Sequence, residues 1–283
     1  MIKITECPRD AMQGIKDFIP TEEKIEYINA ILKCGFDTVD FGSFVSPKAI
    51  PQMQDTAAVL GKLDLNATGS KLLAIIANPR GAEDACKFDE IHYLGFPFSV
   101  SETFQQRNTN SSIEESLGRV EEIQKLCVKH NKKLVVYLSM AFGNHYGDAW
   151  SSEIVVNWAR KLYQLDVRIL SLADTIGSSN PENIKQLFSA IMPEFKDVKI
   201  GAHLHSRTET AKEKIEAAYN SGCVQFDSAI LGFGGCPMAK DDLTGNIATE
   251  IVMDYFSNKN LGINKTAFEE AMRISRNIFN KYH

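Results

Sequence analysis

The sequence predicts an α/β fold, a (β/α)8 TIM barrel with an additional C-terminal helix. Short strand patterns alternate with helical patterns along the chain, and eight such strand-helix units can be traced. They occupy about 250 residues, the usual size of such a barrel. The 283 residues, 44% hydrophobic and 24% charged, can bury one large core. We therefore expect a single domain over 1–283, with 264–283 as a helical extension. A doubly wound sheet is the alternative, but it normally uses fewer strands in one domain.

The first half of the chain contains four strand patterns. The third is almost entirely apolar, as a strand buried on both faces should be. The first helix begins at Thr21, because this threonine follows Pro20 and acidic residues fill the first turn, and it ends near Cys34. A loop is expected between the first strand and this helix, and a second helix over 52–63. The expected strands are 2–6, 38–41, 72–77 and 90–94.

The second half continues the alternation. A long amphipathic helix runs from Ser112 through Val128, and the spacing of Ser112 and Glu115 is that of a capping box. Further helices are expected over 154–163, 180–191, 208–220, 245–256 and 266–282. The last of these either covers the barrel or meets a partner subunit. The expected strands are 134–138, 168–172, 199–203 and 225–230.

Charge and composition exclude several partners. The net charge of -5 gives no overall basic field, and no dense stripe of lysine and arginine indicates nucleic-acid binding. No apolar run approaches the roughly 20 residues of a membrane helix. The opening residues, starting at Met1, lack the apolar region of a signal peptide. We expect a cytoplasmic protein with neither nucleic acid nor membrane as a partner.

The six cysteines are scattered without C-x-x-C spacing. Without a secretory signal, free thiols are favoured over a disulfide framework, and most should be small buried residues. Cys236 differs because it lies beside proline in a glycine-rich loop, where its side chain is more readily presented than packed.

Polar residues fall where these strands end. In a barrel the carboxyl ends of the strands form one rim, and active sites are built there. Several polar side chains on one rim favour a catalytic site more strongly than any pair alone. The residues in question are Arg9, Asp10, Asp40, Asp174, His203 and His205, together with the loop after Ile230.

Four of the polar residues suit one divalent metal. Residues i and i+2 of a strand face the same way, so His203 and His205 can aim two imidazoles at one point. Asp10 after the first strand and Asn246 after the last can reach the same mouth. This mixed set of nitrogen and oxygen donors favours Mg²⁺, Mn²⁺ or Co²⁺ over zinc. Arg9 beside such a Lewis acid could stabilise an enolate oxygen.

Each feature also has a simpler interpretation. A His-Leu-His strand alone is more often a hydrogen-bonded pair, and Arg9-Asp10 alone an ion pair or turn. Asp40 and Asp174 could cap the helices that follow them. The glycine-rich segment 232–235 lacks the lysine of a P-loop and follows the wrong strand for a dinucleotide site, so we interpret it as a mobile lid.

The sequence resembles the hydroxymethylglutaryl-CoA lyases, a family of metal-dependent Claisen-type barrel enzymes. The matching segments appear in family order from near the first residue to about residue 256, and S-F-V-S-P-K and G-G-C-P are the specific ones. They are Pro8-Arg9-Asp10 with Gln13, Ser43-Phe44-Val45-Ser46-Pro47-Lys48, Pro51-Gln52-Met53, Ser101-Glu102, Ser112-Ile113-Glu114-Glu115-Ser116, Asp174-Thr175-Ile176-Gly177, His203-x-His205, Gly234-Gly235-Cys236-Pro237 and Gly245-Asn246-x-Ala248-Thr249-Glu250.

The resemblance implies Mg²⁺- or Mn²⁺-dependent cleavage of 3-hydroxy-3-methylglutaryl-CoA to acetoacetate and acetyl-CoA. By matching position, the metal ligands would be Asp10, His203, His205 and Asn246. Arg9 would stabilise the enolate, and Cys236 matches the family's catalytic cysteine. Asp174 and Asp40 would be acid/base or positioning carboxylates, with the assignment among these three open. An acyl-CoA substrate and a homodimer are the implied partners.

The chain departs from the family pattern at several positions. Asp40 stands where a longer Glu is usual, and Cys7 stands in place of Gly. After His205 the chain reads Ser-Arg-Thr-Glu instead of Asp-Thr-Tyr-Gly. Three alternatives therefore stay open: a related acyl-CoA lyase, an enzyme that condenses acetyl-CoA with a 2-oxo acid, and a metal-binding barrel without catalysis.

Overall fold

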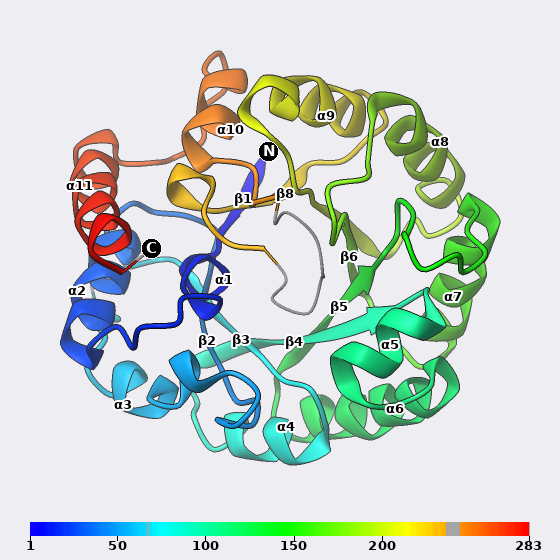
Figure 1. Ribbon diagram of the computed structural model, residues 1–283, viewed down its shortest axis with the longest axis horizontal. Helices are drawn as coiled ribbons and strands as arrows, with labels where there is room; N and C mark the ends of the chain where they lie inside the picture. The colour runs from blue at the N-terminus through cyan, green and yellow to red at the C-terminus, as the bar shows by residue number, and fades with distance from the viewer. Residues whose placement is uncertain (67, 236–243, 283) are drawn as a thin grey trace.

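The computed structural model describes residues 1–66, 68–235 and 244–282. Over these residues, eight parallel strands close into a barrel in chain order, and β1 pairs with β8 to complete the ring. Helices surround the barrel (Figure 1), so the predicted fold class is confirmed. The strands are β1 (Lys3–Glu6), β2 (Thr38–Ser43), β3 (Lys71–Ile75), β4 (Ile91–Ser99), β5 (Lys133–Ser139), β6 (Ile169–Ala173), β7 (Lys199–His203) and β8 (Gln225–Ser228).

All eight strands overlap the predicted ranges, and the predicted helices are present with changed ends. The pattern at 52–63 divides into the 3-10 helix η1 (Pro51–Met53) and α3 (Thr56–Leu60). The capping box at Ser112 is formed, because its hydroxyl accepts from the Glu115 amide and the Glu115 side chain accepts from the Ser112 amide. The remaining predicted helices are α2 (Thr21–Leu32), α6 (Ile113–Lys129), α7 (Ser152–Gln164), α8 (Pro181–Ile191), α9 (Thr208–Asn220), α10 (Thr249–Tyr255) and α11 (Lys265–Tyr282).

Among the described residues, three α-helices were not predicted: α1 (Pro8–Gln13), α4 (Pro79–Ala85) and α5 (Glu102–Thr109); nor was the 3-10 helix η2 (Ile230–Gly232). They are too short for hydrophobic periodicity to register. Their start signals are nevertheless in the sequence, since Pro8 and Pro79 occupy the first helical turn, where proline costs no hydrogen bond. Ser101 caps α5 by accepting from the Phe104 amide. The expected loop after β1 is therefore wrong, and Arg9 and Asp10 lie on a helix.

The C-terminal helix α11 lies against α2 (Figure 1). The rings of Tyr27 and Phe279 meet edge to face, with centroids 6.4 Å apart. The Tyr27 hydroxyl also donates to Ser275 Oγ, and Lys281 pairs with Glu23 at 2.7 Å. This helix thus covers the barrel wall, the first of the two placements expected for it. No helix in the described part of the chain has the length and apolarity to cross a membrane.

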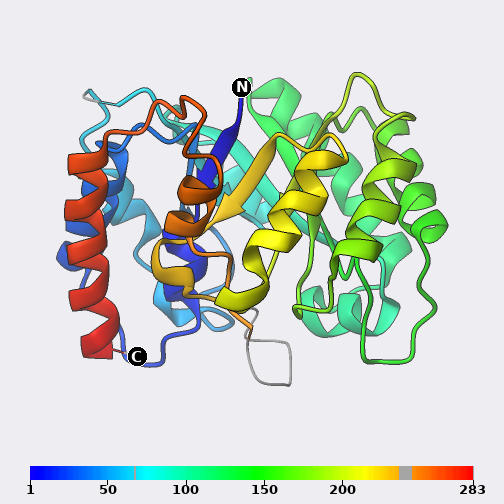
Figure 2. The same cartoon turned by 90° about the horizontal axis from the view of Figure 1, so that it is seen from above.

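The sheet separates two apolar clusters. The larger lies between the strands and the helices, whereas Leu73, Tyr93, Val135 and Tyr137 form a smaller cluster inside the barrel. In Figure 2 the strands run from the face at which the N-terminus lies to the opposite face. The carboxyl ends of the strands and the loops after them build the site on that opposite face.

Candidate metal centre and substrate cavity

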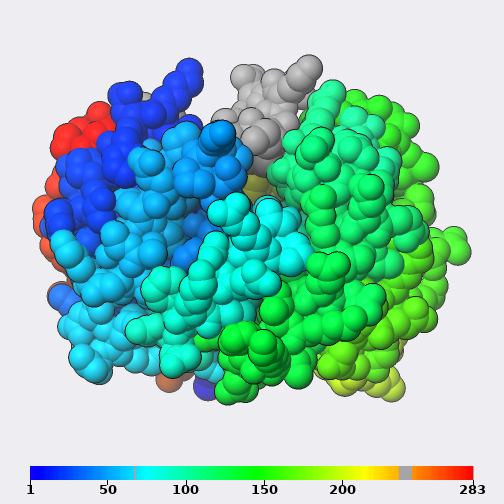
Figure 3. Space-filling model, turned by 90° about the horizontal axis from the view of Figure 1, so that it is seen from below, coloured from blue at the N-terminus to red at the C-terminus, as the bar shows by residue number. Residues whose placement is uncertain are grey.

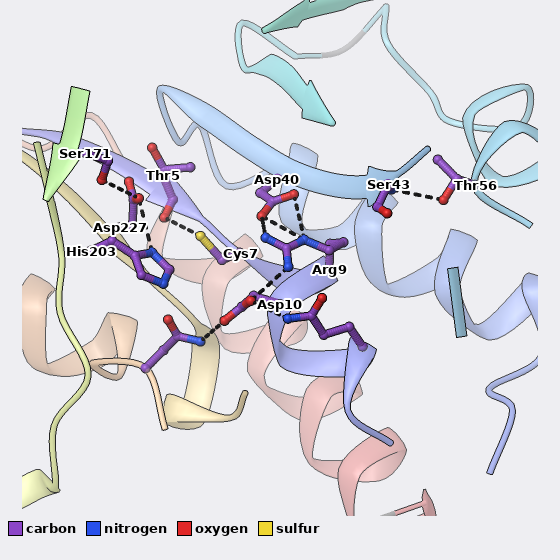
Figure 4. A network of polar contacts seen from close by, with 12 residues as sticks. Thr5, Cys7, Arg9, Asp10, Asp40, Ser43, Thr56, Ser171, His203 and Asp227 are labelled. Carbon is purple, nitrogen blue, oxygen red and sulfur yellow. Dashed lines mark hydrogen bonds and ion pairs between the residues drawn. The ribbon is translucent and has the colours of Figure 1, made fainter. Parts of the chain in front are cut away.

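Helix α1 places Arg9 and Asp10 at the centre of the barrel mouth. Both side chains are buried. Arg9 Nη1 donates to Asp10 Oδ1 at 2.8 Å, while its Nε and Nη2 both donate to Asp40 on β2 (Figure 4). Gln13, one turn further along α1, donates to the same Asp10 oxygen at 2.8 Å. The guanidinium is therefore held between two carboxylates, which fixes its direction.

Asp40 acts here as the partner of Arg9, so the simpler prediction that it caps a helix is wrong. Burial raises the pKa of Asp40 to about 6, and the attraction of Arg9 opposes a larger rise. The strand register shifts between Asp40 and Gly42, which re-aims the end of β2. With both Nε and Nη2 of Arg9 on one carboxyl, this aspartate achieves the paired contact despite being one methylene shorter than glutamate.

The two histidines converge as predicted, although His205 lies beyond the strand. His203 is the last residue of β7, and His205 pairs with Asn246 in an isolated bridge that keeps its backbone extended. Their Nε2 atoms face each other at 3.2 Å. His203 Nδ1 lies 3.2 Å from Asp227 Oδ2 on β8, and Ser171 Oγ donates to the same oxygen (Figure 4). A carboxylate behind a histidine orients its ring toward a metal.

Asn246 completes the group. Its Nδ2 donates to Asp10 Oδ2 at 2.6 Å and to the carbonyl of Phe233 at 3.0 Å. Its Oδ1 is buried and has no hydrogen-bond partner among the described residues. A buried amide oxygen without a partner costs free energy unless a ligand satisfies it. This orphaned atom, beside a carboxylate and two imidazoles, fits a divalent metal.

One ligand atom from each of Asp10, His203 and His205 lies within 4.8 Å of the others. Burial raises the pKa of Asp10, but Arg9, the two histidines and Asn246 together hold that pKa below its usual value. Burial, followed by the neighbouring His203, lowers the pKa of His205 to about 4. An ionised carboxylate and a neutral imidazole are the protonation states in which these side chains bind metals.

A cavity of about 580 Å³ opens over this cluster. Arg9, Asp10 and both histidines lie along it, together with Tyr137, whose ring meets that of His203 edge to face at 5.6 Å. In Figure 3 the hollow at the rim lies between the light-blue loop after β2 and the blue-green region of α5. Its outer wall includes Ser46, Ala49, Ile50, Arg107, Asn108, Thr109 and Arg119.

Three predicted site residues in the described part of the chain do not line this cavity: Asp40 and Asn246, which contact Arg9 and Asp10, and Asp174, which contacts neither. Asp174 lies at the end of β6 and is buried. Its carboxylate accepts from the amide and hydroxyl of Ser179 and lies 3.3 Å from Lys214 Nζ on α9. The carboxylate accepts from a backbone amide, as the capping interpretation predicts. That amide, however, belongs to the loop before α8 and not to the helix itself.

Cys236 lies outside the described residues, so the structure says nothing of its position. The glycine-rich segment is described only through Gly235, and its interpretation as a lid stays a prediction. The other five cysteines are free and buried, as predicted. Cys7 is the one near the centre, and the surrounding burial and carboxylates raise the pKa of its thiol, so it is unsuited to act as a thiolate.

Two further residues that support the site from inside the barrel were missed. Asp227 orients His203, and Glu6 ties β1 to the loop after β8 by accepting from the Ile230 amide and the Thr249 hydroxyl. The sequence does mark both residues as unusual, because each is a carboxylate inside a short strand pattern, at a position where an apolar residue would otherwise pack. Their hydrogen-bond partners cannot be predicted until the register of the barrel strands is known.

Comparison with known proteins agrees with this geometry. A model of the HMGL-like family matches residues 2–278. The chain belongs to the HMGL-like family. A rat protein named 3-hydroxy-3-methylglutaryl-CoA lyase, cytoplasmic, is 34% identical over 250 residues, covering 88% of this chain and 72% of the rat protein. A hydroxymethylglutaryl-CoA lyase of Bacillus subtilis is 33% identical over 246 residues, covering 87% of this chain and 81% of the bacterial one.

Solved structures of HMG-CoA lyases share the fold of this HMGL-like chain. The Bacillus subtilis enzyme superposes with a TM-score of 0.91 at 30% identity, covering 99% of this chain and 94% of that one. The Acinetobacter baumannii enzyme, solved with coenzyme A and 3-methylmalate, gives a TM-score of 0.90 at 26% identity, covering 99% and 92%. The family resemblance stated from the motifs is confirmed.

Proposed function

We propose that this protein is a metal-dependent carbon-carbon lyase that cleaves 3-hydroxy-3-methylglutaryl-CoA to acetoacetate and acetyl-CoA. The observation that carries the proposal is the cluster of Asp10, His203 and His205 beneath an open cavity, with the unpartnered Asn246 oxygen beside it. Its HMG-CoA lyase relatives, about one third identical over most of the chain, support the substrate.

The metal would be held by Asp10, His203, His205 and Asn246. Bound there, it would supply Lewis-acid polarisation of the substrate's oxygens. We favour Mg²⁺ or Mn²⁺, because carboxylate, amide and imidazole donors without a thiolate suit these ions. We further propose a homodimer in the cytoplasm, and a relative named as a cytoplasmic enzyme supports that compartment.

The reaction requires one proton to leave the C3 hydroxyl and another to reach C2. As a basic side chain of the site takes the hydroxyl proton, the C2–C3 bond breaks, C3 becomes the ketone of acetoacetate, and the electron pair of the broken bond forms the enolate of acetyl-CoA. Of the arginines that line this cavity, Arg9 is the one bonded to the proposed metal ligand Asp10, and its two carboxylate partners hold it in one direction. We assign it to the enolate oxygen, because a pre-oriented donor stabilises developing charge without reorganisation.

Protonation of the enolate carbon completes the reaction. We propose Cys236 as the acid, on its family match alone. Asp40 supports Arg9 through the paired contact. The contacts of Asp174 with Ser179 and Lys214 favour a positioning role over proton transfer at this carbon.

The first test measures acetoacetate and acetyl-CoA released from 3-hydroxy-3-methylglutaryl-CoA by chelator-stripped protein, with and without Mg²⁺ or Mn²⁺. Metal-dependent release is expected. A folded protein that binds Mn²⁺ but releases neither product would refute the substrate while leaving the metal site intact.

A Cys236→Ala variant then tests the proton donor. The expected result is a large loss of turnover with Mn²⁺ affinity unchanged. The matched control is Cys127→Ala, since Cys127 is buried on α6 away from the cavity. An unchanged rate in Cys236→Ala removes this cysteine from the mechanism.

A further inference from the structure

The opposite mouth of the barrel carries a second arrangement of charged side chains. The first residue of each odd-numbered strand is a lysine: Lys3 on β1, Lys71 on β3, Lys133 on β5 and Lys199 on β7. In a barrel, alternate strands contribute side chains to the same layer. The four lysines therefore begin four alternate strands at one end of the barrel, the face at which the N-terminus lies (Figure 2).

Strand alternation places these lysines in the inward-facing row. Leu73 follows Lys71 by two residues, and Val135 follows Lys133 by two, and both belong to the cluster inside the barrel. Lys3 and Lys199 line a small pocket of about 40 Å³ at this mouth, on the floor formed by that cluster. The outermost row of the barrel interior is thus a ring of lysines, two of which, Lys3 and Lys199, line the pocket itself.

The ring carries excess positive charge. Lys3 pairs with Asp37 at 2.7 Å, with both side chains more than a third exposed. Within the described part of the chain, the side chains of Lys71, Lys133 and Lys199 form no hydrogen bond or ion pair with the protein. The other carboxylate along the pocket, Asp227, is occupied by His203 and Ser171.

The lysines also repel one another electrostatically. Partial burial lowers the pKa of Lys199, and repulsion from Lys3, Lys133 and Lys71 lowers it further, against the attraction of Asp37. An ordinary solvated surface intersperses the two signs of charge. A focused cluster of one sign around a pocket instead attracts a counter-ion of opposite charge.

We propose that the N-terminal mouth of this barrel binds a phosphate dianion, held by the lysines at the start of β1, β3, β5 and β7. Ammonium groups that approach from several sides suit a tetrahedral oxyanion, since each donates to a different oxygen. The small volume of the pocket favours inorganic phosphate over a bulky ester. This site is separate from the metal centre, which lies at the other end of the strands.

The test is a calorimetric titration of the full chain with potassium phosphate in chloride buffer at constant ionic strength. Saturable binding is expected for the wild type. A parallel titration with glycerol 3-phosphate distinguishes the free ion from a monoester. Equal affinity assigns the site to the phosphate group in either form, whereas a preference for inorganic phosphate assigns it to the free ion. No saturable binding of either compound overturns the proposal.

Variants locate the site. Lys133→Gln/Lys199→Gln is expected to weaken phosphate binding about tenfold, because two partly exposed charge contacts are lost. Lys133→Arg/Lys199→Arg keeps the charges and is expected to keep most of the affinity, which separates lost contacts from misfolding. The matched control Lys125→Gln/Lys185→Gln removes the same net charge from exposed positions on α6 and α8.

A third variant addresses the substrate cavity, where phosphate could bind instead. Arg107→Gln/Arg119→Gln removes the arginines on the cavity wall. Phosphate binding that survives in this variant and falls in the lysine pair supports the proposal. Binding that falls in the arginine pair, or equally in the exposed lysine control, overturns it.

Discussion

The sharpest prediction concerns Asp227, which touches no proposed substrate or metal and acts through His203. The change is Asp227→Asn, which keeps the shape of the side chain and removes its charge. His203 Nδ1 and Ser171 Oγ both contact Asp227 Oδ2, each at 3.2 Å. Burial lowers the pKa of His203, but the bond to Asp227 and its charge reverse this and raise the pKa above its usual value. The carboxylate thus makes the imidazole a stronger base.

The expected magnitude follows from this geometry. Losing the partner behind a metal-binding histidine weakens metal affinity by about 10- to 100-fold. The 3.2 Å contact is longer than a strong charge-assisted bond, and asparagine can still accept from the ring, so the lower limit applies. We expect Mn²⁺ affinity to fall about tenfold, which corresponds to about 1.4 kcal/mol of binding free energy.

The assay is a Mn²⁺ titration in which electron paramagnetic resonance reports the free ion. Two controls accompany it. Ser171→Ala removes the other donor to Asp227 and should change affinity by a factor of about two at most. Asp254→Asn removes an exposed carboxylate on α10 that pairs with Lys212, and should change nothing. An Asp227→Asn protein that is folded and binds Mn²⁺ as tightly as the wild type would refute the reasoning.

Three other substitutions test the frame around the site. Burial raises the pKa of Glu6 from 4.5 to about 8. The stability that its protonated form contributes is therefore complete below pH 4.5 and is lost as pH rises through 8. In urea unfolding, Glu6→Gln should reduce this pH-dependent fall in the free energy of unfolding. A free energy of unfolding that falls as steeply with pH in Glu6→Gln as in the wild type would contradict this prediction. Gly42→Ala places a Cβ 2.5 Å from the Thr56 methyl carbon, so urea unfolding should show a loss of about 1–3 kcal/mol, against no loss at the open Gly118. Asp40→Asn leaves the buried Arg9 short of one charge; we expect unfolding free energy to fall by about 3 kcal/mol and turnover to fall with it, and a variant with full turnover would show that Arg9 keeps its direction unaided.

Local sequence determined the barrel and most of the candidate metal site. Eight short apolar patterns separated by helical ones leave few arrangements that bury every strand, so the closed barrel followed from periodicity. His203 and His205 were found because alternation along extended backbone aims them together, and Asp10 because strand ends share one rim. The short helices α1, α4 and α5 were not predicted, since proline or a capping side chain marks their starts but periodicity does not extend through them.

Tertiary structure decided which charged groups meet. Asp40 pairs with Arg9, Asp227 stands behind His203, and Asp174 turns toward Lys214, and none of these pairings follows from the distance along the chain. The lysines of the opposite mouth, far apart in the sequence, likewise share a layer only once the ring is closed. The physical reason is that a residue's own pattern sets the face it occupies, whereas closure of β8 against β1 sets the register, and the register alone determines which buried charges must neutralise one another.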